Sequence, residues 1–301
     1  MFSGDMVADT GRVLSPSAHK PQVIAEALTA GGWPIEFIAP QPTAVDDFCR
    51  VHDARFVEDV LQMKRANGFG STSPSVARSL PYTTGACYDS AFVAMKEGVS
   101  ASLTSGFHHA GPSGGRAYCT FNGLMVAAAQ LLAEERVQQV AIVDADYHYG
   151  DGTQAIIDLH GYDDRVQHVS FGQTYKRPAQ ADHYLEAVRG LRARFAQRRP
   201  DLILYQAGAD THVNDPLGGL LTTAQMRERD REVFTIARDL DIPVTWNLAG
   251  GYQVEEDGSI PRVVELHLNT FEEALRTWGL AVPARAAATT STTPTTPVAP
   301  R

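Results

Sequence analysis

Carboxylate and imidazole side chains alternate along the segment DADYHYGDGT, directly after the apolar run VAIV. Asp144, Asp146 and His148 are two residues apart, so an extended chain would project them to one side. An aspartate and a histidine placed in this way can chelate one metal ion. A lone Asp-x-Asp more often caps a turn, but three titratable groups at this spacing, just beyond a buried run, favour a metal site.

A third ligand is available at Asp210, which ends the run LILYQAGAD. A catalytic zinc typically takes three protein ligands and keeps one position open for water or substrate. Asp146, His148 and Asp210 would supply these three ligands. The oxygen-rich set also suits iron(II) or another divalent ion. Taken alone, Asp210 could equally be a helix cap or a turn residue.

Two adjacent histidines, His108 and His109, follow the run ASLTSGF. Asp144 and Asp151 are candidate partners for them, and such pairing could keep one imidazole largely cationic while the other serves as a general base. Hydrolysis by an activated water needs a base for the water and an acid for the leaving amine. An isolated His-His dipeptide is more often structural, so this interpretation depends on the neighbouring metal motif.

Tyr252 ends the segment VTWNLAGGY, after Gly250 and Gly251. The glycines would let the backbone approach the site closely, and the phenol could donate a hydrogen bond to a developing oxyanion. A plain turn tyrosine is the alternative.

The elements that must position these residues follow a regular alternation of short apolar runs and longer segments of helical period. Strands are predicted at Ile35–Ala39, Ala101–Phe107, Val140–Asp144, Val166–Phe171, Leu202–Gln206 and Val244–Leu248. Helices are predicted at Tyr82–Glu97, Leu124–Glu135, Tyr184–Gln197, Thr223–Asp239 and Pro261–Trp278, with a further helix starting near Thr153 and with Thr222 or Thr223 as an N-cap. Continuous apolar runs indicate strands buried on both faces. We therefore expect one α/β domain with a doubly wound, mainly parallel sheet and helices on both faces, whose ligands bind beyond the carboxyl ends of the strands.

Composition limits the classes of function. The net charge of −9 over 301 residues, with no basic block, argues against direct nucleic-acid binding. The three cysteines are widely separated, and no signal peptide or membrane span is apparent, so a cytoplasmic protein without membrane association is expected. Residues 1–282 would form the catalytic domain, and the Thr-, Pro- and Ala-rich segment 283–301 a disordered tail.

Five segments in the same order and spacing resemble the histone deacetylase superfamily, which includes acetylpolyamine amidohydrolases and shares the arginase-deacetylase fold. The carriers of the resemblance are VHDARFVEDV, SGFHHAGPSGGRAYCTFNG, DADYHYGDGT with the strand ending VSF, GADTHVNDPLGGLLT and LAGGY. The resemblance implies catalytic zinc on Asp146, His148 and Asp210. It also implies His109 as general base and acid, His108 as its electrostatic companion, Asp144 and Asp151 as their orienting carboxylates, and Tyr252 as the group that polarises the acyl carbonyl.

The same resemblance implies the surroundings of the reaction centre. Tyr118 and Leu217 would line a tunnel for an acyl-lysine-like chain, and Gly251 would border it. Backbone carbonyls around Asp144, with Ser170 and Phe171, would form a structural potassium site. After VSF the chain reads GQTYKRP and lacks the family's Phe-Phe-Pro loop, so Phe171 or Tyr175 is a candidate for the second tunnel aromatic.

Several alternatives stay open at this point. The substrate could be acyl-lysine in a peptide or protein, which we favour, or an acetylated polyamine or another small N-acyl amine. A non-catalytic protein that binds acylated ligands would share the pocket. An arginase-like manganese enzyme would share the fold, but it would need a second set of bridging aspartates. The oligomeric state is left open.

Overall fold

Five parallel strands form the central sheet of this computed structural model, which describes residues 1–10 and 15–284. Their order across the sheet is β1-β5-β4-β2-β3. The strands are β1 (Val99–Ser102), β2 (Val140–Asp144), β3 (Val166–Ser170), β4 (Leu202–Gly208) and β5 (Val244–Ala249). Every residue of β2, β4 and β5 is buried, as their continuous apolar runs predict.

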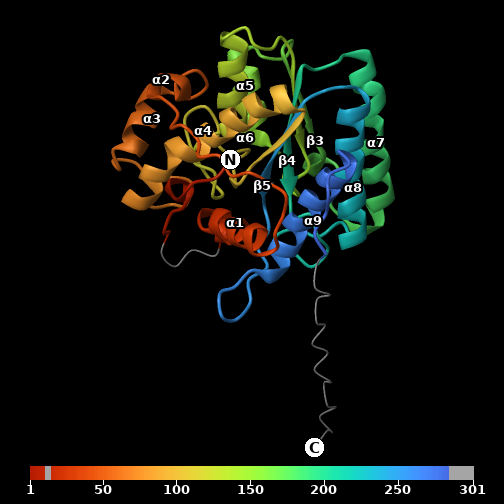
Figure 1. Cartoon of the computed structure of the whole chain (residues 1–301). Coiled ribbons are helices and arrows are strands. Elements are labelled where there is room, and N and C mark those ends of the chain that lie inside the picture. Colours follow the sequence, from red (N-terminus) through yellow and green to blue (C-terminus); the bar gives the residue numbers. More distant parts are fainter. Residues whose placement is uncertain (11–14, 285–301) are drawn as a thin grey trace, which may run out of the picture.

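Helices cover both faces of the sheet (Figure 1). Along β2, Val140 and Ile142 belong to one hydrophobic cluster, while Ala141 and Val143 belong to the other. The first cluster lies under α4, α5 and α6, and the second under α7, α8 and α9. This arrangement confirms the predicted doubly wound α/β fold.

The described helices begin and end at the following residues: α1 Lys20–Ala30, α2 Val45–Phe48, α3 Ala54–Leu61, α4 Pro74–Glu97, α5 Gly123–Ala133, α6 Asp151–His160, α7 Ala181–Gln197, α8 Thr223–Asp239 and α9 Pro261–Thr277. Side chains cap several of them at the N-terminus. Thr222 accepts a hydrogen bond from the backbone of Gln225 at the start of α8, and Asn122 accepts one from Met125 at the start of α5. The cap predicted at Thr222 is therefore confirmed.

The chain changes direction across the sheet between β2 and β4. From β2 it continues outward to the edge strand β3, and it then returns to β4 on the other side of β2. Neighbouring loops diverge at such a switch point, which leaves room for a ligand at the carboxyl edge. Asp146 follows β2 and Asp210 follows β4, so two of the predicted metal ligands lie at this switch point.

The strand predicted at Ile35–Ala39 is wrong. This segment carries no strand, and its two backbone hydrogen bonds to other residues run from Phe2 N to Ile38 O at 3.0 Å and from Ile35 N to Trp33 O at 2.8 Å. Pro34 and Pro40 flank it and lack the N–H groups that a ladder needs. Its apolar side chains therefore indicated an extended chain that lies against the protein without joining the sheet.

The strand predicted at Ala101–Phe107 is shifted. β1 covers Val99–Ser102, because φ is +101° at Gly106 and +91° at Phe107 and the backbone there turns towards His108. The helix predicted from Tyr82 is too short, since α4 begins at Pro74 and continues through Pro81. The sequence pattern did not predict α1, α2 or α3. Pro283 and Ala284 have no regular structure, and the rest of the predicted tail lies outside the described residues.

Candidate metal centre and active site

The three predicted metal ligands come together at the carboxyl edge of the sheet. His148 Nδ1 lies 2.9 Å from Asp210 Oδ2 and 3.2 Å from Asp146 Oδ1. One ligand atom from each residue lies within 4.8 Å of the others. Asp146 and Asp210 are buried, whereas His148 is partly exposed. A divalent ion held here would have protein on one side and an accessible side for a further ligand.

The protonation of this cluster fits a divalent cation. Burial and the Asp146 carboxylate raise the pKa of Asp210 to about 7. Hydrogen bonds to Asp146 and Asp210 raise the pKa of His148 to about 10. Burial alone would raise the pKa of Asp146, but His108 and His148 outweigh it and hold that pKa below its ordinary value. The two carboxylates thus differ: Asp146 stays ionised, whereas Asp210 holds its proton more tightly, and a divalent ion would favour the ionised form of both.

Backbone packing fixes the two aspartates. A Cβ on Gly250 would lie 2.3 Å from Asp210 Oδ1, so only glycine lets the β5 end approach so closely. Arg229 of α8, which is fully buried, donates from Nη1 to Gly208 O at 2.8 Å and to Ala145 O at 3.3 Å. These carbonyls belong to the ends of β4 and β2, close to the ligands. Sequence reasoning did not single out Arg229.

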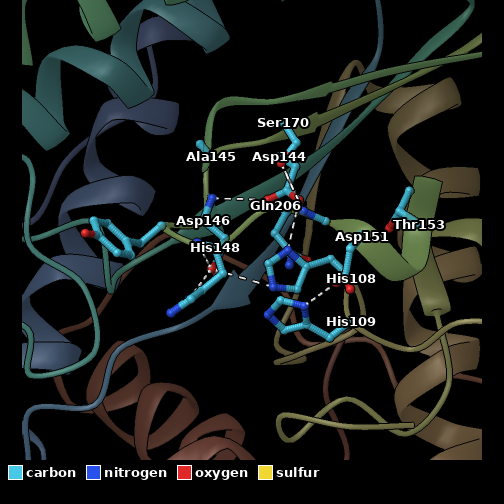
Figure 2. A network of polar contacts seen from close by, with 12 residues as sticks. His108, His109, Asp144, Ala145, Asp146, His148, Asp151, Thr153, Ser170 and Gln206 are labelled. Carbon is cyan, nitrogen blue, oxygen red and sulfur yellow. Dashed lines mark hydrogen bonds and ion pairs between the residues drawn. The ribbon is translucent and has the colours of Figure 1, made fainter. Parts of the chain in front are cut away.

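The histidine pair lies beside this cluster, with its two rings 4.1 Å apart (Figure 2). Nδ1 of His108 lies 2.9 Å from Asp144 Oδ2, and Nδ1 of His109 lies 2.6 Å from Asp151 Oδ1. A carboxylate only accepts, so each imidazole donates from Nδ1 and keeps Nε2 for other chemistry. The structure therefore places each histidine against the carboxylate suggested for it from the sequence.

Opposite pKa shifts separate the two imidazoles. Burial lowers the pKa of His108, but Asp144 and Asp146 outweigh burial and raise it to about 9. Burial and the neighbouring His108 lower the pKa of His109 to about 3. At neutral pH His108 is therefore cationic and His109 neutral, with an available lone pair on Nε2. When the pKa values of two neighbouring groups shift in opposite directions, the neutral one is suited to act as a base and the charged one to stabilise charge.

The loop that carries the histidines is held by α6 and by His52. Thr153 N of α6 donates to His108 O at 3.0 Å (Figure 2). Asn122 Nδ2 donates to Thr153 Oγ1 at 3.0 Å. His52 Nδ1 lies 2.9 Å from Gly111 O, and its Nε2 accepts from Asn122 N at 2.9 Å. The buried His52 thereby ties the loop after the histidine pair to the start of α5.

Arg116 is a further member of the site that sequence reasoning missed. Its guanidinium forms an ion pair with the Asp151 carboxylate that also binds His109. The signal for it was present, since Arg116 lies within the conspicuous segment SGGRAYC.

Tyr252 and Tyr118 lie side by side, with ring centroids 5.9 Å apart. Burial, together with Asp146 and Asp210, holds the pKa of Tyr252 far above its ordinary value, so the phenol keeps its proton. The Asp215 carboxylate accepts hydrogen bonds from Tyr252 N at 2.7 Å and from Leu217 N at 3.0 Å. Asp215 therefore connects the Tyr252 backbone to that of exposed Leu217. Sequence reasoning did not identify Asp215.

Two buried residues, Gly251 and Lys20, lie next to the segment that carries Tyr252. Gly251 is buried and has a φ of +89°, which favours glycine. Lys20 of α1 is fully buried and donates from Nζ to Gly250 O. Burial lowers the pKa of Lys20 to about 7, against the attraction of Asp210, Asp146 and Asp215.

The aromatic candidates after β3 lie elsewhere. Phe171 is 5% exposed, and its ring packs 5.0 Å from that of Tyr184 in the core. Tyr175 also packs on Tyr184, at 5.6 Å. The structure does not bring either ring to Tyr118 and Tyr252. Lys176 of this loop contacts the metal-binding segment through the Tyr147 carbonyl. Ser170 Oγ lies 3.3 Å from Asp144 Oδ2.

Fold and site together define a parallel α/β protein with one candidate mononuclear metal site and a histidine pair at the switch point of its sheet. A family model for the histone deacetylase domain matches residues 15–179 and 174–270. The chain belongs to the histone deacetylase family, which confirms the resemblance drawn from its motifs.

Individual relatives agree with this assignment. Histone deacetylase 2 of Arabidopsis thaliana is 27% identical over 183 residues, which cover 53% of this chain and 46% of the relative. The crystal structure of the HD domain of HDA15 has a TM-score of 0.69 at 19% identity and covers 93% of both chains. An acetylpolyamine aminohydrolase from Burkholderia pseudomallei has a TM-score of 0.67 at 17% identity and covers 92% of this chain and 98% of its own. At these identities the two structures show a shared fold.

The chain spans about half the length of the curated relatives it matches. Among the residues that the structure describes, no helix is both long and apolar enough to cross a membrane.

Proposed function

We propose that this protein is a zinc-dependent amidohydrolase that removes acetyl or other acyl groups from the side chains of N-acylated lysines. The observation that carries the proposal is the divergent histidine pair, in which neutral His109 and cationic His108 lie beside the Asp146–His148–Asp210 cluster. A metal site alone is compatible with many reactions. A neutral base and a protonated phenol next to it are what the hydrolysis of an amide requires.

Asp146, His148 and Asp210 would hold the ion, through two carboxylate oxygens and Nδ1. A divalent metal at this position would lower the pKa of water and polarise the acyl carbonyl. Among the described residues, these three form the only group of three or more side chains placed to bind a metal. That supports one ion per chain and argues against an arginase-like pair. Zinc suits the ligand set, and iron(II) is the alternative.

His109 would accept the proton of the attacking water on Nε2, since Nδ1 is committed to Asp151. The same nitrogen would then protonate the leaving amine. His108, held cationic by Asp144, would favour the negative charge that develops on the attacked carbonyl. The Tyr252 hydroxyl would donate a hydrogen bond to that oxygen and needs no change in its own charge.

The substrate chain would run past Tyr118, Leu217 and Gly251. Tyr118 packs on Tyr252, and Leu217 is an exposed apolar side chain held by the carboxylate that also holds Tyr252. The predicted contact of substrate with Phe171 would have to involve its backbone, because its ring lies in the core.

We also propose a structural potassium ion beside β2 and β3, on oxygens of Asp144, Ser170 and Phe171. Asp144 and Ser170 are register partners in the sheet, so their backbones lie side by side.

A hydrolysis panel with the zinc-loaded protein tests the proposed function. It should contain acetyl-lysine peptides, acetyl-lysine peptides with longer acyl groups, and N-acetylputrescine. We expect release of free lysine side chains, and loss of that activity in Asp210→Ala. The absence of hydrolysis in the whole panel, with zinc bound, would favour the non-catalytic alternative.

A further inference from the structure

A lysine stands beside the candidate metal site, in the loop where a second tunnel aromatic was sought. Lys176 Nζ donates to the Tyr147 carbonyl at 2.7 Å and lies 4.4 Å from the centroid of the Tyr147 ring. In return, the Tyr147 hydroxyl donates to the Lys176 carbonyl at 2.9 Å. Tyr147 directly precedes the ligand His148, and the two rings are 5.4 Å apart. The ammonium group thus lies at the exposed side of the metal-binding segment.

Contacts within the loop after β3 fix the backbone position of Lys176. Gln180 Oε1 accepts hydrogen bonds from Lys176 N at 2.9 Å and from Arg177 N at 3.1 Å. A Cβ on Gly172 would lie 2.4 Å from the His148 carbonyl carbon, so the loop closes directly onto the ligand's backbone. These contacts hold the lysine against the site, whereas a free surface lysine would explore many rotamers.

Tyr147 links Lys176 to the groups expected to contact the substrate. Its backbone N–H donates to Asp210 Oδ1 at 3.2 Å. Its ring packs against Gly218, where a Cβ would lie 3.3 Å from Tyr147 Cγ, next to Leu217. Lys176 and Leu217 therefore flank the same tyrosine.

Lys176 adds a positive charge beside the site, and its ammonium group binds a backbone carbonyl. A divalent ion would be neutralised by Asp146 and Asp210. Two other cationic groups near the site pair with carboxylates: His108 with Asp144, and Arg116 with Asp151. The acidic segment 255–257 lies in a separate turn of the β5–α9 loop, which protrudes from the body in Figure 1. Once a metal is bound, the Lys176 ammonium would add a positive charge on the exposed side of the site.

We infer that Lys176 is a specificity-determining residue that disfavours substrates with an ammonium group near the scissile amide and favours substrates with a carboxylate there. This inference rests on the proposed function. An acetylated polyamine retains an ammonium a few bonds from its amide, whereas acetyl-lysine within a peptide is uncharged at that distance. Two like charges about 7 Å apart in a partly aqueous site change binding on the order of three- to tenfold. The substrate class is therefore N-acyl lysine in a peptide or an N-acyl amino acid.

Three acetamides of matched chain length separate the effect of charge from that of size: 5-acetamidopentanoate, N-pentylacetamide and N-acetylputrescine. For the zinc-loaded protein we expect kcat/KM to fall in that order. Lys176→Met keeps an apolar side chain on Tyr147 but removes the charge, so the kcat/KM values for the three compounds should become more nearly equal. Lys176→Arg should retain the order, and so should the control Arg177→Met, which removes the neighbouring exposed charge. High salt should weaken the order in the wild type and leave Lys176→Met nearly unaffected.

Binding to the inactive His109→Ala variant, measured by calorimetry, separates this inference from the proposed function. The same order of affinity for the three acetamides would support the role of Lys176 even if the wild type hydrolyses none of them. A preference for N-acetylputrescine, or an equal effect of Lys176→Met on all three compounds, would overturn the inference while leaving the hydrolase itself intact.

Discussion

At the scale of single residues, the proposed hydrolysis depends on two side chains that come from different strand ends. His109 follows the turn after β1, and Tyr252 follows β5, yet both lie by the ligands that follow β2 and β4. Neither belongs to the candidate ligand set, so we expect that each can be replaced without emptying the proposed metal site. That separation makes their roles testable one at a time.

Replacing Tyr252 with Phe should lower turnover by a factor on the order of 10²–10³, as expected for the loss of one oxyanion donor. The backbone N–H that binds Asp215 remains, so the loop should keep its position. Zinc content, measured by elemental analysis of the same preparation, should be unchanged. Near-normal turnover in this variant would refute the assigned role of the phenol.

Replacing His109 with Ala should be at least as damaging as Tyr252→Phe, because one imidazole would serve as base and then as acid. The His108–Asp144 pair should persist, since its contacts do not involve His109. Steady-state kinetics on an acetyl-lysine peptide measure the effect. An active His109→Ala enzyme would mean that the base has been misassigned.

Local spacing predicted which side chains cluster at the sheet edge, namely the candidate ligands, the histidine pair and the tyrosine, because strand ends with polar clusters are visible in the sequence. It did not predict Arg229, Lys20 or Asp215, whose burial depends on contacts between distant elements. Arg229 left one signal: it lies three residues after Met226 and four before Val233, which puts a charge on the buried face of a helix. The role of Lys176 was likewise hidden, since it depends on the fold of the loop after β3.

At the scale of elements, the continuous apolar runs predicted most strands correctly. The segments between them were predicted less well. β2 matches its predicted bounds, and β3, β4 and β5 deviate only at their ends. Ile35–Ala39 failed because an apolar extended segment between prolines looks like a strand until its hydrogen bonds are known. The start of α4 was misplaced because Pro81 suggested a helix boundary, although tertiary packing carries the helix through it.

Arg229 of α8 should support the metal site through the ends of β2 and β4. Arg229→Lys keeps the charge beside Asp230 but loses the forked contacts to Gly208 O and Ala145 O. We expect zinc affinity to fall by about 10- to 100-fold, as for other groups that support metal ligands. Competition with a chelator measures it. Arg231→Lys, on the exposed side of the same helix, is the control. Equal affinities in both variants would contradict this role.

His52 should make the anchoring of α5 sensitive to acid. Burial lowers its pKa from 6.5 to about 4, so the folded state prefers the neutral ring. Between these values the unfolded chain binds the proton more readily, and stability is therefore lost as the pH falls from 6.5 towards 4. The contribution is on the order of 3 kcal/mol.

The test for His52 is denaturant unfolding at a series of pH values, for the wild type and for His52→Gln, whose amide can replace both hydrogen bonds. On unfolding within this pH interval, the variant should take up about one proton fewer than the wild type. Identical pH dependence in the two proteins would show that His52 is not the responsible group.

At the scale of the whole molecule, the strand order brings the site residues together at the carboxyl edge of the sheet, and the charged side chains gather there too. The switch point between β2 and β4 provides the space, and the strands on either side deliver the metal ligands and the tyrosine. Parallel topology is what lets residues from 108 to 252 meet at one place. Fold class and the location of the site therefore followed from the sequence pattern, while the charge balance around the site required the structure.

We propose that one metal ion at Asp146, His148 and Asp210 makes this protein an amide hydrolase. The most direct test is to titrate the metal-free protein with zinc while following both bound zinc and the hydrolysis of an acetyl-lysine peptide. We expect activity to rise in proportion to binding and to saturate at one zinc per chain. Activity that needs two ions per chain, or full occupancy without hydrolysis, would contradict the account.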